Sequence, residues 1–154
     1  MDYVAIQTEN FDLTAEYQQM LEGATCSGAV VLFTGLVRDF NQGEQVLELE
    51  LEHYPGMAEK ALLAIIEKAR QRWALDRIRV IHRVGKLAIA QQIVLVAVSS
   101  AHRSDAFSAA AFIMDFLKTE VPIWKKEATD KGSRWVEFNQ KELEAKALWQ
   151  AKGE

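Results

Sequence analysis

The chain has 154 residues, of which 49% are hydrophobic and 26% charged, and only two are prolines. This composition excludes a disordered or collagen-like chain and suits a single globular domain over residues 1–154 with a hydrophobic core. The formal net charge of −4 argues against non-specific binding to nucleic acid, which normally needs a strongly basic surface.

The sequence also argues against a membrane protein and a metalloprotein. No apolar run reaches the ~18 residues that a membrane-spanning helix needs, and Met1 leads into Asp2 rather than into a basic and then apolar signal segment. We therefore expect a cytoplasmic protein. The single cysteine, Cys26, rules out an internal disulfide, and the three histidines are too far apart in sequence to show metal-ligand spacing. We expect neither a metal site nor a bound cofactor.

The first half of the chain predicts three strands and two helices. Asp12 is a suitable N-cap for the first helix, and Gly23 ends it. Gly35 interrupts the apolar second strand, which indicates a bulge or a close approach of two backbones. The third strand alternates leucine with glutamate, and we expect it to pair with the second as an antiparallel hairpin. The predicted strands cover residues 4–7, 28–37 and 46–53, and the helices 13–21 and 57–73.

The second half predicts strands at 78–84 and 92–99, a helix from Ser104 as N-cap to Lys118, a last strand at 133–138 and a charged helix at 141–152. The helix that ends at Lys118 is apolar nearly all round, so we expect it to be buried. No GxGxxG or phosphate-binding P-loop follows a strand. These features predict an α+β domain in which helices cover one face of a mixed or mostly antiparallel sheet, rather than a doubly wound parallel sheet.

A polar corner joins the 92–99 strand to the helix that follows. His102 and Arg103 lie there beside several serines, so hydrogen-bond donors gather at the unpaired N–H groups of a helix N-terminus. This arrangement predicts a site for a phosphate or a carboxylate. The alternative is that both residues only cap or brace the end of the strand.

Lysines occur at the other end of the same helix. Lys118 continues a helical stripe that includes Phe107 and Met114, and Lys125 follows a proline that turns the chain back. Two ammonium groups held close together beside an apolar wall lower each other's pKa into the range useful for proton transfer. The alternative is that these lysines interact with the helix C-terminus and otherwise lie in water.

Six motifs occur in one order: TGLVR (34–38), LEHYPGM (51–57), SAHR (100–103), FIMDFLKT (112–119), PIWKKE (122–127) and RWVE (134–137). This set resembles the large, catalytic subunit family of molybdopterin synthase from about Gly28 to Glu137, while residues 1–27 and 140–154 match weakly. The resemblance implies an α+β fold of the α/β-hammerhead type. It also implies a sulfur transferase of molybdenum cofactor biosynthesis.

The implied enzyme converts a small-molecule pterin phosphate, cyclic pyranopterin monophosphate, into molybdopterin by adding two sulfur atoms. The sulfur would come from the thiocarboxylate on the Gly-Gly C-terminus of a small ubiquitin-like subunit, whose tail enters a pocket of the large subunit. A homodimer of large subunits with one small subunit at each end would form a heterotetramer. We expect neither nucleic acid nor a membrane as a partner.

The resemblance assigns roles to three groups of residues by their position in the motifs. The first is the catalytic pair, Lys118 and Lys125. The second binds substrate: Val37, Arg38, His102, Arg103, Lys126 and Glu127. The third is the candidate wall of the pocket: Phe33, Met114 and Arg134.

We hypothesise that the thiocarboxylate sulfur attacks the pterin side-chain carbon. Lys118 would position the end of the tail and stabilise charge on its carbonyl, and Lys125 would move protons for the substrate oxygen that leaves. His102 and Arg103, with Arg38, would hold the phosphate, with one of them contributed across the dimer. Two alternatives stay open: a non-catalytic module that binds a phosphorylated ligand or a partner's C-terminal tail, and a purely structural scaffold.

Overall fold

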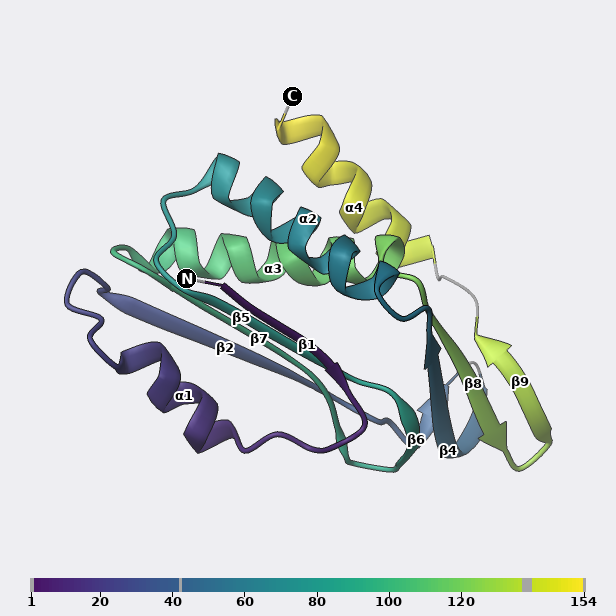
Figure 1. The fold of residues 1–154 in the computed structure, drawn as a ribbon. Coiled ribbons are helices and arrows are strands. Elements are labelled where there is room, and N and C mark those ends of the chain that lie inside the picture. The colour runs from purple at the N-terminus through teal and green to yellow at the C-terminus, as the bar shows by residue number, and fades with distance from the viewer. Residues whose placement is uncertain (1, 42, 137–139, 154) are drawn as a thin grey trace.

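The computed structural model describes residues 2–41, 43–136 and 140–153. Its helices and strands alternate irregularly along the chain (Figure 1). The strands are β1 Asp2–Gln7, β2 Ala29–Leu36, β3 Phe40–Asn41, β4 Glu44–His53, β5 Ile78–Arg83, β6 Gly85–Ala88, β7 Gln92–Ser100, β8 Ile123–Thr129 and β9 Gly132–Val136. The helices are α1 Leu13–Leu21, α2 Met57–Arg72, α3 Arg103–Glu120 and α4 Gln140–Gly153.

The first sheet has four strands among the described residues, is mixed and is covered by helices on both faces. Its strand order is β1-β5-β7-β2, with β1 parallel to β5 and the other neighbours antiparallel. Apolar residues of α2 and α3 pack with alternate residues of β5 and β7 to form the main core. The helix α1 lies on the opposite face of the sheet (Figure 1). The α+β class with a mixed, helix-covered sheet is therefore confirmed, and α1 corrects the expectation that helices cover one face only.

A second sheet, with five strands in the described part of the chain, lies beside the first and has β4 at its centre. Its order is β3-β4-β8-β9, and β6 also pairs with β4. The predicted hairpin between the second and third strands is therefore wrong, because β2 pairs with β7 in the first sheet and β4 pairs with β6 and β8 in the second. An alternating strand such as β4 has only one apolar face, and it buries that face in a separate small core with Val84 and Leu87.

A bulge in β2 comes directly before the segment that reaches the second sheet. The pairing of β2 with β7 shifts register between Gly35 and Leu36, as Gly35 led us to expect. A Cβ added at position 35 would lie 2.8 Å from Cγ1 of Val94, so a side chain there would collide with the side chain of Val94. Past the bulge, Val37 exchanges backbone hydrogen bonds with Ala90 and Gln91, which holds the start of the crossover in place.

The long helix α3 differs from its prediction at both ends. It begins at Arg103 with His102 as N-cap, and no side chain caps it, so Ser104 is not the N-cap. It continues past Lys118 to Glu120, which leaves Lys118 in the last turn. The C-terminal helix α4 packs on α3: Nε1 of Trp149 donates to Oδ2 of Asp115 at 2.7 Å, and Arg72 of α2 donates to the carbonyl of Trp149 at 2.8 Å.

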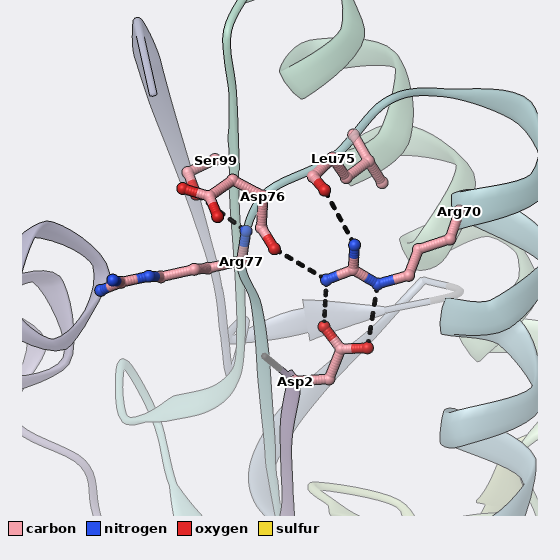
Figure 2. A network of polar contacts seen from close by, with 6 residues as sticks. All are labelled: Asp2, Arg70, Leu75, Asp76, Arg77 and Ser99. Carbon is pink, nitrogen blue, oxygen red and sulfur yellow. Dashed lines mark hydrogen bonds and ion pairs between the residues drawn. The ribbon is translucent and has the colours of Figure 1, made fainter. Parts of the chain in front are cut away.

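Arg70 joins the end of α2 to β1 and to the turn before β5 (Figure 2). Its guanidinium donates to both carboxylate oxygens of Asp2 at the start of β1. It also donates to the carbonyl of Leu75 at 2.8 Å and to the carbonyl of Asp76 at 2.9 Å, in the turn before β5. A planar guanidinium is needed to reach all four acceptors at once.

We expect Arg70→Met to lower the free energy of unfolding by about 2–3 kcal/mol, because it leaves two part-buried carbonyls and a carboxylate without their donor. Urea unfolding followed by circular dichroism measures the difference. Lys60→Met, an exposed change on the same helix, should stay within about 0.5 kcal/mol of the wild type. Equal midpoints for the two variants would contradict the role given to Arg70.

None of the helices in the described part of the chain is both long and apolar enough to cross a membrane.

Candidate active site

A cavity of about 610 Å³ opens where the end of α3, the strand β8 and the segment after β2 meet. We call it the lysine cavity. Apolar residues from both sheets line it, including Leu49, Ile93 and Val136. Five of the positions that the sequence assigned to catalysis or substrate binding also line it: Val37, Arg38, Lys118, Lys125 and Glu127. Glu142 of α4 adds a further charged group to the wall.

Lys118 and Lys125 reach the lysine cavity from different elements. Lys118 extends from the last turn of α3, and Lys125 from β8, where it pairs with Leu51 of β4. The turn at Val121 and Pro122 reverses the chain between them, as the proline predicted. Nζ of Lys118 lies 3.7 Å from Oε1 of Glu142, and its side chain is 37% exposed. The two lysines that the sequence placed in one site are therefore brought together.

The pKa of Lys125 is lowered to about 8 from its ordinary value of 10.5. Burial is the largest cause, because it disfavours the charged ammonium, and the positive charge of Lys118 and a side-chain hydrogen bond with it act in the same direction. Glu142 and Glu127 oppose the shift. A lysine with such a pKa releases and accepts protons near neutral pH, which an ordinary surface lysine does not.

Glu127 shares the inward face of β8 with Lys125, since side chains two residues apart in a strand point to the same side. Its residue is only 6% exposed. Arg134, opposite it on β9, donates to Oε2 from Nη2 at 3.1 Å and from Nε at 3.3 Å. Arg134 is not among the residues that line the cavity, and it reaches the wall through Glu127.

Besides Arg134, three more of the predicted positions on the strands and on the middle of α3 lie outside the lysine cavity. Lys126 points to the opposite face of β8, where its Nζ lies 5.6 Å from the centre of the Trp135 ring. Phe33 is 41% exposed on β2, and Met114 packs against the main core from α3. Alternation along the strand explains the position of Lys126. The helical stripe that joins Phe107, Met114 and Lys118 lies mostly at the surface of α3, because Phe107 is 63% exposed and Met114 is only partly buried.

His102 and Arg103 lie at the far end of α3 from Lys118. Both are exposed at the helix N-terminus. A helix rises 1.5 Å per residue, so the 15 steps from Arg103 to Lys118 span roughly 22 Å. Within one chain, the corner predicted to bind an anion and the lysine cavity are therefore separate.

Sequence reasoning missed two residues beside the lysines. Glu142 reaches the cavity from α4, and nothing in a charged terminal helix distinguishes it from its neighbours. His82 is 4% exposed at the end of β5, and its Nδ1 lies 2.7 Å from the carbonyl oxygen of Arg83. Its pKa is lowered to about 4, chiefly by burial and further by the charges of Lys125 and Lys118. It is therefore a neutral ring next to the lysine pair.

We expect the buried His82 to make the protein sensitive to acid. Its pKa is about 4 in the folded chain and 6.5 ordinarily, so the unfolded chain binds more protons between these values. The free energy of unfolding should fall by on the order of 3 kcal/mol as pH drops from 6.5 to 4. Urea unfolding at several pH values measures the slope. His82→Gln should flatten it and His102→Gln, at an exposed site, should not; the same slope in all three proteins would refute the assignment.

Within residues 2–41, 43–136 and 140–153, no three His, Cys, Asp or Glu side chains gather closely enough to hold a metal ion. Cys26, the free cysteine, is exposed between α1 and β2 and does not line the lysine cavity.

Comparisons with known proteins agree with this architecture. The family model described as "MoaE protein" matches residues 6–120. The molybdopterin synthase catalytic subunit of Vibrio cholerae is 51% identical over 97% of this chain and 100% of its own length. Among solved structures, molybdopterin cofactor biosynthesis protein E from Burkholderia multivorans is similar with a TM-score of 0.82 and 46% identity, covering 97% of both chains. Molybdopterin synthase from Staphylococcus aureus has a TM-score of 0.78 and 38% identity, covering 86% of this chain and 96% of that one.

The two solved structures share the α+β fold of this chain, and all three relatives are named for molybdopterin synthesis or its cofactor. The chain belongs to the MoaE family. The family resemblance of the six sequence motifs is thereby confirmed.

Proposed function

We propose that this chain catalyses sulfur transfer in molybdenum cofactor biosynthesis, converting cyclic pyranopterin monophosphate into molybdopterin with two new sulfur atoms. The observation that carries the proposal is the lysine pair in one cavity, with the pKa of Lys125 near 8. It supports an enzyme because a merely solvated lysine would keep its ordinary pKa of 10.5. The names of the relatives supply the reaction in which this chemistry would act.

The sulfur donor in this proposal is the C-terminal thiocarboxylate of a small ubiquitin-like subunit that ends in Gly-Gly. A relative named a catalytic subunit implies a second subunit. This chain has one cysteine, and Cys26 lies away from the lysine cavity, so it is poorly placed to carry sulfur to the substrate. The volume of about 610 Å³ is in the range of small-molecule sites, and an extended tail could enter beside a pterin.

The lysines divide the chemistry between them. The thiocarboxylate sulfur attacks the pterin side-chain carbon, so a carbon–sulfur bond forms as a carbon–oxygen bond breaks, and the tail is joined to the pterin as a thioester. Water then attacks the thioester carbonyl, and the carbonyl–sulfur bond breaks, which releases the tail as a carboxylate and leaves the sulfur on the pterin. The ammonium of Lys118 holds the end of the tail and stabilises negative charge on its carbonyl oxygen. Lys125 moves the proton that the departing oxygen needs, for which a pKa near neutrality is suitable.

The substrate phosphate is held by Arg38, which lines the cavity, together with His102 and Arg103 from a second copy of the chain. The length of α3 supports this arrangement, since roughly 22 Å separates the two ends within one copy. The corresponding assembly is a homodimer of this chain with one small subunit at each end, a heterotetramer.

The decisive experiment mixes the purified chain with a thiocarboxylated ubiquitin-like partner and the cyclic pterin phosphate, and measures the dithiolene product. Formation of product with repeated turnover is the expected result. A protein that binds the tail and the pterin phosphate but yields no product would instead be the non-catalytic module considered above.

A further inference from the structure

The two lysines of the lysine cavity have unequal surroundings. Nζ of Lys118 lies 3.7 Å from Oε1 of Glu142, and the Lys118 and Glu142 side chains are 37% and 25% exposed. Lys125 lies deeper, with burial as the main influence on its ammonium and with Lys118 near enough to hydrogen bond with it. The carboxylate of Glu142 therefore stabilises the ammonium of Lys118, the more exposed lysine. The ammonium of Lys125 is destabilised by burial, without an ion pair of the same kind among the described residues to offset it.

Other charged groups near the lysines are already paired or are cationic. On β8, Glu127 is held by Arg134 of β9. At the end of α3, Glu120 pairs with Lys68 at 3.6 Å and with Lys146 at 3.2 Å. The remaining titratable or cationic neighbours are Arg38 in the cavity wall, His82 on β5 and His53 on β4. Among the described residues, Glu142 is thus the carboxylate of the cavity wall that forms an ion pair with Lys118.

We propose that Glu142 is a positioning residue that keeps a proton on Lys118 and so leaves Lys125 as the group that gives and takes protons. Two ammonium groups in a half-buried cavity repel each other, so the first proton to leave the pair could come from either one. A carboxylate beside one member stabilises the charge there and decides the choice. The chemical roles that follow rest on the proposed function: Lys118 is the permanent cation at the tail carbonyl, and Lys125 is the proton carrier.

The test is an NMR titration of the free protein with ¹³C label at the lysine Cε positions, between about pH 6 and 10, the range around a lysine pKa near 8. In the wild type, Lys125 should lose its proton before Lys118. Its signal is identified as the one that is missing from the spectrum of Lys125→Arg. In Glu142→Gln, the Lys118 and Lys125 signals should move together in a shared first step, at a pH lower by roughly half a unit.

Two further variants make the result specific. Glu144→Gln removes an exposed carboxylate from the same helix outside the cavity lining and should leave the wild-type pattern unchanged. Glu142→Asp keeps the charge on a shorter side chain and should restore separate titration of the two lysines. The proposal is overturned if the first signal to titrate belongs to Lys118, if Glu142→Gln keeps the wild-type pattern, or if the Asp variant behaves like the Gln variant.

This titration needs no substrate, so it separates the inference from the proposed function. A wild type that forms no dithiolene product but shows the expected titration would end the sulfur-transfer proposal and leave the role of Glu142 intact. Where turnover is present, Glu142→Gln should lower kcat about tenfold and move the acid limb of the pH profile to lower pH. An unchanged pH profile would remove the link between Glu142 and proton transfer.

Discussion

Lys118→Ala is expected to lower the rate of sulfur transfer by at least about 100-fold while leaving the fold intact. The change removes the cation that faces the tail carbonyl in the proposed reaction. The fold should survive because the Lys118 side chain is 37% exposed and its ion pair is with Glu142 of α4, not with the main core. Dithiolene formation with a thiocarboxylated partner measures the rate, and circular dichroism checks the fold.

Lys141→Ala provides the matched comparison, since it removes an exposed lysine from α4 next to Glu142 and outside the cavity lining. Its turnover should equal that of the wild type. Full turnover by a folded Lys118→Ala protein would refute the catalytic assignment and favour the binding module.

Lys125→Met is expected to abolish sulfur transfer and, unusually, to make the protein more stable. The folded-state pKa of Lys125, about 8, is below its ordinary 10.5, so the buried ammonium destabilises the folded chain wherever both states hold the proton. Below about pH 8 the Met variant should therefore gain about 2–3 kcal/mol. The unfolded wild type binds more protons between pH 8 and 10.5, so wild-type stability rises there and the advantage of the variant disappears.

Urea unfolding at about pH 7 and pH 10 measures both parts of this prediction, and the dithiolene assay measures the loss of activity. Lys126→Met is the natural control, because the adjacent lysine points to the other face of β8, beside Trp135. It should show no comparable gain in stability. A destabilised Lys125→Met protein, or a gain that persists at pH 10, would show that burial of the Lys125 ammonium carries no such cost.

Local patterns in the sequence predicted the helices well. Asp12 accepts hydrogen bonds from the backbone N–H groups of Thr14 and Ala15, as an N-cap should, and α2 begins at Met57 and ends one residue short of its predicted end. These features depend on residues within a few positions of one another, which a sequence displays directly. Hydrophobic periodicity does not reveal which strand pairs with which, and this is why β2 and β4 were assigned to one hairpin.

Three strands within the described ranges were not predicted, and the shortest of them, β3, has only two residues. β6 is only four residues long, and β8 carries Lys125 and Lys126 side by side, so neither shows the apolar alternation of a half-buried strand. The C-terminal strand was predicted at 133–138. The observed β9 begins one residue earlier and covers residues 133–136 of that range, and residues 137 and 138 lie outside the described part of the chain.

The candidate site was predictable only in part for the same reason. The convergence of Lys118 and Lys125 follows from a helix end and a proline that lie close in sequence. The approach of Glu142 depends on how α4 packs on α3, which involves Trp149 and Asp115, 34 positions apart. The distance between His102 and Lys118 follows from the full length of α3. Naming the two residues as candidate cations does not show that they lie at opposite ends of one helix.

The close contact at Gly35 couples two positions that are far apart in the chain. Because a methyl group at 35 would meet Cγ1 of Val94, alanine fits there only if Val94 rotates its side chain or is replaced by a smaller residue. Val94 is itself 4% exposed in the main core, so neither adjustment is free. Homologous sequences should therefore show correlated substitutions at positions 35 and 94. An engineered change at one of the two positions needs a compensating change at the other to keep the segment that leads to Arg38 in register.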